Sequence, residues 1–123
     1  MSILVMSDIH RFPKNVDGDF YTTGYKDKNG EWVGCCLFCN LPEEEAPDLL
    51  APLDKGNCDT YFVKQPSNSH ELDQAIASTE VCCVDAIRYG GKDKSILRRI
   101  DPSLTDFKIS IFGFVVPNKS WFI

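Results

Sequence analysis

The chain has 123 residues, of which 43% are hydrophobic and 25% are charged, and its formal net charge is −5. This composition is typical of one ordinary globular domain and argues against disorder, collagen-like repeats and coiled coil. A negative chain without a long run of Lys and Arg also argues against a nucleic-acid partner, because phosphate contacts need clustered cations.

The first third of the chain predicts an arm, a hairpin and a short helix. Residues 1–18 combine a short apolar run, residues 3–6, with turn-forming residues, and predict an N-terminal strand or arm. Residues 20–33 place β-favouring side chains on both sides of Asn29-Gly30, which predicts a β-hairpin with a type I′ turn. Pro42 followed by three glutamates predicts the first turn of a short helix.

The clearest helix lies in the middle of the chain. Residues 61–63 predict a short strand that Pro66 closes. Asn68 can cap a helix, and Glu71 stands in the capping-box position three residues later, so we expect a helix from about residue 69 to residue 81. A strand over residues 86–89, stopped by Gly90-Gly91, follows it.

The last third is basic and then aromatic. Residues 92–100 predict one or two helical turns, and residues 107–116 form a β-type run with Gly113 inside it. We expect this aromatic tail to be an added strand packed on the domain or on a partner subunit rather than a membrane anchor. No stretch reaches the roughly 18 apolar residues that span a bilayer.

Six cysteines are unevenly placed along the chain. They form two clusters and one single position: Cys35, Cys36 and Cys39; Cys58; Cys82 and Cys83. This placement is more typical of a metal or redox centre than of disulfides spread over loops. The first residues do not have the basic and apolar segments of a secretory signal, and we expect a reducing cytoplasm.

The strongest chemical feature is Cys36-Leu37-Phe38-Cys39 together with the distant Cys82, which directly follows the predicted helix. Two thiolates two residues apart can reach one metal centre, and a third from a helix end can close on the same centre. A Cys-x-x-Cys alone also suits a thioredoxin-like redox pair or two buried thiols.

Five stretches of the chain carry a resemblance to a known family. In chain order they are Gly18-Asp19-Phe20-Tyr21, Cys36-Leu37-Phe38-Cys39, Ala46-Pro47-Asp48, Tyr61-Phe62-Val63-Lys64-Gln65-Pro66 and Cys82-Cys83-Val84-Asp85-Ala86-Ile87. This order resembles the single-cluster bacterial-type ferredoxins. In that family a Gly-x-Phe-Tyr strand precedes a Cys-x-x-Cys-x-x-Cys run, a strand ends in Gln-Pro, and a helix delivers Cys-Pro-Val-x-Ala-Ile.

The resemblance implies an α+β, ferredoxin-like fold (bacterial 4Fe-4S ferredoxin type) over roughly residues 15–91 of a single domain, 1–123. An inserted β-hairpin around Asn29-Gly30 and a C-terminal strand extension over residues 92–123 add to it. The implied function is one-electron transfer by a non-enzymatic carrier. The implied ligands of one iron-sulfur cluster are Cys36, Cys39 and Cys82, with Leu37, Phe38, Val84 and Ile87 around them.

The departures from the family pattern leave alternatives open. Pro42 stands where the family's third cysteine belongs, and Cys83 replaces the proline after the distal cysteine. Three cysteines can hold a 3Fe-4S cluster, and Cys35, Cys58 or Cys83 can supply the fourth ligand of a 4Fe-4S cluster. An alignment with Cys36 and Cys39 as second and third ligands is also open. The rival is a ferredoxin-derived interaction subunit of a larger assembly, its cluster altered or lost.

Two further sequence features bear on partners and metals. Glu43, Glu44, Glu45 and Asp48 form an acidic patch that can steer a basic redox partner, and the aromatic tail is the other docking candidate. Asp8-Ile9-His10 after an apolar run is similar to the opening of calcineurin-like metallophosphoesterases. The remaining ligands for two metals are missing from the sequence, so we favour an ordinary strand end.

Overall fold

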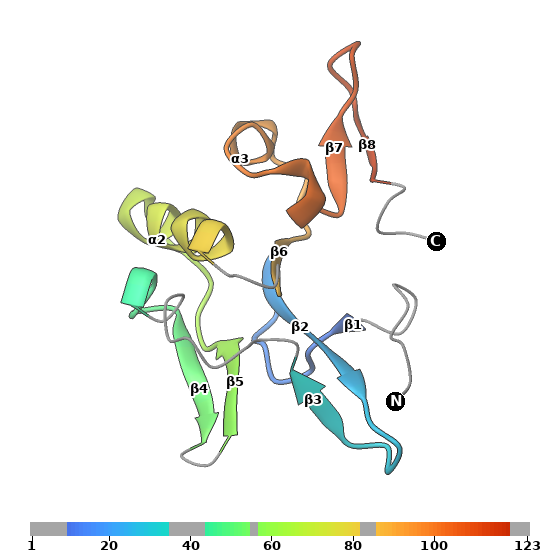
Figure 1. Cartoon of the computed structure of the whole chain (residues 1–123). Helices are drawn as coiled ribbons and strands as arrows, with labels where there is room; N and C mark the ends of the chain where they lie inside the picture. The colour runs from blue at the N-terminus through green and yellow to red at the C-terminus, as the bar shows by residue number, and fades with distance from the viewer. Residues whose placement is uncertain (1–9, 35–43, 55–56, 82–85, 119–123) are drawn as a thin grey trace.

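The fold is described from a computed structural model that defines residues 10–34, 44–54, 57–81 and 86–118, with the side chains of 52–54 and 57–59 left out of the description (Figure 1). In chain order the elements are β1 (His10–Arg11), β2 (Phe20–Lys26), β3 (Trp32–Gly34), β4 (Leu50–Asp54), β5 (Asn57–Phe62), α2 (Ser69–Val81), β6 (Ile87–Tyr89), α3 (Lys94–Leu97), a 3-10 helix (Pro102–Leu104), β7 (Phe107–Ile109) and β8 (Val115–Pro117). Within these residues, no helix is long and apolar enough to cross a membrane.

The central strand is β2, which pairs antiparallel with β1, β3 and β6. Two separate antiparallel hairpins, β4–β5 and β7–β8, complete the strands that the structure describes. The paired strands are antiparallel and occur with two helices, α2 and α3, so the fold class is α+β as the sequence predicts.

β3 and β6 occupy the same edge of β2, one after the other. Alternate residues of a strand direct their N–H and C=O groups toward the same edge. The Asp27 N–H donates to the Glu31 C=O at 2.8 Å, and the Thr23 N–H, four residues earlier, donates to the Ala86 C=O at 2.9 Å. β6 therefore continues this edge where β3 ends, while β1 pairs with the opposite edge.

The predicted hairpin between β2 and β3 is confirmed, but the predicted turn type is wrong. The Gly30 N–H donates to the Asp27 C=O at 3.0 Å, which closes a four-residue turn, and Gly30 has a φ of 80°. The Asp27 carboxylate also accepts from the N–H groups of Asn29 and Glu31. The loop is thus a type I turn followed by a left-handed glycine, because the Asp27 side chain favours that geometry over the two-residue type I′ turn.

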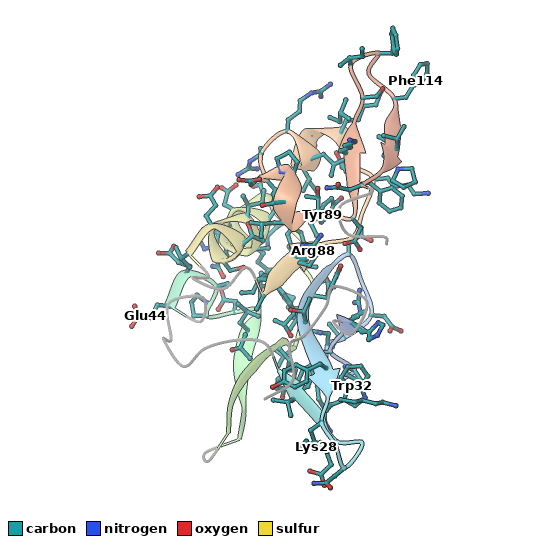
Figure 2. All side chains as sticks on the ribbon, turned by 45° about the vertical axis from the view of Figure 1, so that its right-hand side comes forward. Lys28, Trp32, Glu44, Arg88, Tyr89 and Phe114 are labelled. Carbon is teal, nitrogen blue, oxygen red and sulfur yellow. The ribbon has the colours of Figure 1, made fainter. Side chains whose placement is uncertain are left out.

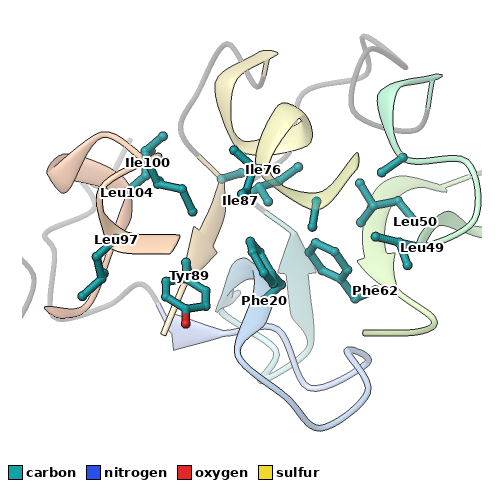
Figure 3. Close-up of a cluster of buried hydrophobic side chains, with 13 residues drawn as sticks. Phe20, Leu49, Leu50, Phe62, Ile76, Ile87, Tyr89, Leu97, Ile100 and Leu104 are labelled. Carbon is teal, nitrogen blue, oxygen red and sulfur yellow. The ribbon is translucent and has the colours of Figure 1, made fainter. Parts of the chain in front are cut away.

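One hydrophobic cluster joins the strands to both helices (Figure 3). Its buried members are Phe20, Ala46, Leu49, Leu50, Phe62, Ala75, Ile76, Ala86, Ile87, Tyr89, Leu97, Ile100 and Leu104. The ring centroids of Phe20 and Tyr89 lie 4.9 Å apart, and those of Phe20 and Phe62 lie 6.0 Å apart. Phe20 therefore joins β6 to the β4–β5 hairpin through aromatic packing.

A buried asparagine fixes the segment before β2. The Asn15 amide nitrogen donates to the C=O groups of Phe12 and Thr22, and its oxygen accepts from the N–H groups of Thr22 and Phe62. All of these partners are backbone groups, so the side chain replaces missing sheet hydrogen bonds between the arm, β2 and β5. The apolar run predicted for residues 3–6 lies outside the described residues.

The predicted middle and late elements are confirmed with two corrections. The helix runs from Ser69 to Val81 as expected, and β6 and α3 fall within their predicted ranges. The strand predicted over residues 61–63 is longer and begins earlier, because β5 runs from Asn57 to Phe62. Residues 107–116 form a hairpin instead of the single strand predicted as the C-terminal extension. The reason is the turn at Gly113, which has a φ of 85° and donates its N–H to the Ser110 C=O.

Candidate functional site

The chain leaves the edge of β2 and returns to it at adjacent positions. Gly34, the last residue of β3, pairs with Gly24, and the next residue along β2 toward its start, Thr23, binds Ala86. The Thr23 hydroxyl also donates to the Ala86 C=O, at 3.0 Å. Gly34 and Ala86 are the described residues that flank segments 35–43 and 82–85, so the two cysteine-bearing segments attach to one point of the sheet.

The helix α2 begins with a complete cap and ends just before Cys82. The Asn68 side-chain oxygen accepts from the Glu71 N–H at 2.8 Å, which is the predicted N-cap contact. The Glu71 carboxylate reaches one residue further back than in a standard capping box, and accepts from the Ser67 N–H at 2.9 Å and the Ser67 hydroxyl at 2.8 Å. The cap fixes the start of the helix at Ser69, and the helix runs from there to Val81, the residue before Cys82.

Glu71 is held in its charged form by these contacts. The Lys64 ammonium donates to the Glu71 carboxylate at 2.6 Å. This hydrogen bond, followed by those from Ser67, lowers the pKa of Glu71 from 4.5 to about 2. Lys64 lies just after β5, so the ion pair also joins the end of the β4–β5 hairpin to the start of α2.

Gln65 connects two of the motifs that carry the family resemblance. Its amide oxygen accepts from the Phe20 N–H at 3.0 Å, and its amide nitrogen donates to the Phe20 C=O at 2.8 Å. Gly18 has a φ of 147°, and a Cβ on it would collide with the Gln65 side chain. Only a glycine at position 18 leaves room for the Gln65 side chain, and Gln65 in turn binds the backbone at the start of β2.

The predicted cluster residues fall mostly outside the described part. Beyond it lie Cys35, Cys36, Leu37, Phe38, Cys39, Cys82, Cys83 and Val84. Cys58 belongs to β5, but its side chain is not described. Ile87 is fully buried in the hydrophobic core. Among the described residues no group of three or more His, Cys, Asp or Glu side chains could hold a metal ion.

The acidic patch and the Asp-x-His segment are partly described. Glu44, Glu45 and Asp48 are exposed, and Asp48 accepts from the Gln74 amide of α2 at 3.1 Å. His10 is exposed on β1, and its ring meets that of Trp32 edge-on at 6.4 Å. Asp8 and Glu43 lie outside the described residues.

A buried polar network was not predicted from the sequence. Arg88, near the centre of the molecule in Figure 2, donates to the C=O groups of Ser103 and Thr105 at 2.8 and 3.1 Å, and lies 3.4 Å from the Asp106 carboxylate. The Tyr21 hydroxyl donates to the same carboxylate at 2.6 Å. Burial first, and then this hydrogen bond, raises the pKa of Tyr21. The network attaches residues 102–106 to β2 and β6.

A pocket of about 560 Å³ was also not predicted. It lies between the start of β2, residues 65–68, the first turns of α2 and the helix α3. Phe20, Leu72, Tyr89 and Ile96 give it a largely apolar lining. Such a pocket has no sequence signal, because its walls come from segments that are far apart in the chain.

Comparisons of this chain with models of protein families, with curated proteins and with solved structures found no match.

Proposed function

We propose that this chain is a one-electron carrier with a ferredoxin-like fold that holds a single iron-sulfur cluster on Cys36, Cys39 and Cys82. The observation that carries the proposal is that Gly34 and Ala86 bind two adjacent residues of β2, Gly24 and Thr23. Cys36 is two residues from Gly34, and Cys82 directly follows the end of α2. The attachment points of all three thiols therefore belong to one region of the fold.

The contacts between the motifs support the ferredoxin-like reading of the fold. A strand begins at Phe20, a strand ends shortly before Gln65-Pro66, and a helix ends at Val81, in the order that the resemblance implies. Gly18 and Gln65, which belong to different motifs, pack against each other. If the two motifs occurred in this order by chance, we would not expect the residue of one to require the absence of a side chain in the other.

The donor set fits the proposed group. Thiolates are the usual ligands of iron-sulfur clusters, and three of them satisfy a 3Fe-4S cluster whereas a fourth completes a 4Fe-4S cluster. When bound, such a cluster supplies reversible one-electron transfer. Ile87 follows Ala86 directly and is fully buried, so it excludes water from this side of the region.

The rest of the chain gives the carrier its environment. Cys35, Cys58 and Cys83 remain the candidates for a fourth ligand, and the exposed acidic residues Glu44 and Asp48 suit a basic redox partner. A reducing cytoplasm keeps free thiols available for metal, so we place the carrier there.

The first experiment measures iron and acid-labile sulfide per chain in anaerobically purified protein, with EPR spectra of the oxidised and reduced forms. A signal in the oxidised form that disappears on reduction, with three irons, would support the three-cysteine site. A signal that appears only on reduction, with four irons, would mean that a further cysteine completes the cluster. Protein that contains no iron after anaerobic purification and reconstitution would contradict the proposal.

Single Cys→Ser variants then assign the ligands. Cys82→Ser is expected to abolish the visible absorbance and the native iron content, as are Cys36→Ser and Cys39→Ser. Cys58→Ser tests a candidate for the fourth ligand in β5: it should turn a four-iron protein into a three-iron protein if Cys58 is that ligand, and leave the iron content unchanged if it is not. Unchanged absorbance and iron content in Cys82→Ser would remove that residue from the ligand set.

The second candidate function is an interaction subunit whose cluster is altered or lost. The observation that favours it is Pro42, which stands where the family's third cysteine belongs. Iron-free protein that is fully folded and that binds a protein partner would select this alternative.

A further inference from the structure

The turn of the β7–β8 hairpin carries a cluster of exposed apolar side chains. Ile111 is 95% exposed, Phe112 is 80% exposed and Phe114 is 67% exposed. The hairpin extends away from the rest of the molecule at the top of Figure 1, and Phe114 is at that end in Figure 2. The turn, residues 110–114, contains no charged residue. We refer to it as the apolar tip.

A small groove with two cations lies directly below the apolar tip. It has a volume of about 280 Å³ and separates α3 from the β7–β8 hairpin. Arg98 and Lys108 line it together with apolar side chains, and its lining includes no carboxylate. Neither cation forms an ion pair with a carboxylate in the part of the chain that the structure describes. Ile109 lines the groove and is the last β7 residue before the tip, so the two features are continuous.

The positive charge of the chain is concentrated in the segment that carries the apolar tip and the groove. Residues 92–118, which form α3 and the hairpin, contain five Lys or Arg and three Asp, a net charge of +2. The remaining residues carry a net charge of −7, which together with this +2 gives the −5 of the whole chain. An anionic surface therefore attracts the end of the molecule that bears the apolar tip and repels the remainder.

The size of the tip distinguishes between the surfaces that it can bind. A stable protein interface covers about 800 Å² on each partner, which is far more than three side chains at a turn provide. A bilayer surface needs no matching cavity, because aromatic and aliphatic side chains enter the boundary between headgroups and acyl chains while cations remain at the phosphates. An exposed apolar turn above two cations that form no ion pair within the described residues has the chemistry of this second case.

We propose that the apolar tip and the groove below it bind the surface of a bilayer that contains anionic phospholipid. Ile111, Phe112 and Phe114 enter the boundary region, and Arg98 and Lys108 bind the phosphate groups. This places the hairpin against the membrane surface, whereas the sequence predicts an added strand packed on the domain or on a partner subunit. Within the described residues no helix is long and apolar enough to span the bilayer. The proposal does not depend on whether the chain holds a cluster.

The test is co-sedimentation of the full chain with vesicles of phosphatidylcholine alone or of an equimolar mixture of phosphatidylcholine and phosphatidylserine. We expect the chain to bind the mixed vesicles and to bind phosphatidylcholine weakly. The variant F112S/F114S is expected to lose binding to both. The variant R98Q/K108Q is expected to bind the mixed vesicles roughly 30-fold more weakly, with its binding to phosphatidylcholine unchanged.

Two matched control variants keep the test specific. V16S/V63S removes two exposed apolar side chains elsewhere in the chain, and K14Q/K28Q removes two exposed cations that do not line the groove. Both are expected to bind the mixed vesicles within about threefold of the wild type. Absence of wild-type binding to mixed vesicles, or equal binding by F112S/F114S, would overturn the proposal. So would a concentration-dependent dimer without lipid that F112S/F114S abolishes, since the tip would then bind another protein surface.

Discussion

The start of β2 and the β7–β8 hairpin use their aromatic residues in opposite ways. At the start of β2, Phe20 is buried between Phe62 and Tyr89, and its backbone groups bind the Gln65 side chain. At the hairpin turn, Phe112 and Phe114 are exposed to solvent. The first region uses its aromatic area for folding, whereas the second leaves that area free, so stability does not explain the residues at the tip.

The two regions are nevertheless joined by buried polar contacts. Arg88 of β6 binds the C=O groups of Ser103 and Thr105, and Asn118 donates to Thr105 and Pro102 from the other side. The base of the hairpin is therefore part of the folded core even though its turn is not.

The largest effect is expected from Arg88→Met, which removes the connection between the regions. The substitution removes the Arg88 donor from the Ser103 C=O, and one of two donors from both the Thr105 C=O and the Asp106 carboxylate. We expect a loss of about 3–5 kcal/mol in the free energy of unfolding, measured by urea denaturation. Arg99→Met is the control, because Arg99 and its partner Asp73 are both exposed and the pair contributes about 0–1 kcal/mol. Equal losses in the two variants would contradict the role of the network.

Gly18→Ala tests the packing at the start of β2. Both Gly18 and Gly30 have positive φ angles, but only at Gly18 would a Cβ collide with another side chain. We expect Gly18→Ala to cost about 2–3 kcal/mol and Gly30→Ala about 1 kcal/mol in denaturation experiments. If the two costs are the same, the contact with Gln65 does not matter and the φ angle alone explains both.

Glu71 is expected to make stability depend on pH in the acid range. Its pKa is about 2 in the folded chain and 4.5 ordinarily, so the folded state binds fewer protons and gains stability from the charged carboxylate above pH 4.5. That stability is lost as the pH falls from 4.5 toward 2. In Glu71→Gln the loss over this range, followed by thermal unfolding at each pH, should be smaller. Glu80→Gln, which removes an exposed carboxylate from the same helix, should keep the wild-type slope.

The smallest effect is expected at the apolar tip. Because Phe112 and Phe114 are mostly exposed, F112S/F114S should change the free energy of unfolding by less than about 0.5 kcal/mol. Phe20→Ala in the same assay should cost about 3–5 kcal/mol, since Phe20 is buried. A large loss in the tip variant would mean that the hairpin turn contributes to folding, and the contrast between the two regions would fail.

Elements with local signals were predictable from the sequence. The helix α2 was correctly placed because its cap, Asn68 with Glu71, and its apolar spacing lie within one short stretch. The β2–β3 hairpin was predicted for the same reason, although the side chain of Asp27 decided the turn type. The hairpin at residues 107–117 was missed because Ile111, Phe112 and Phe114 are not typical turn residues, although Ser110 and Gly113 are.

The features of the candidate site also divide into those with a local sequence signal and those that depend on tertiary contacts. The sequence by itself determined the order of the motifs, the helix that ends before Cys82 and the α+β class, because each depends on short-range spacing. Only the tertiary structure decided that Gly34 and Ala86 meet β2 at adjacent positions, that Gln65 packs on Gly18, and that Arg88 holds the C-terminal segment. These contacts join residues far apart in the chain, and pairing at such separations follows from packing the whole core rather than from any local pattern.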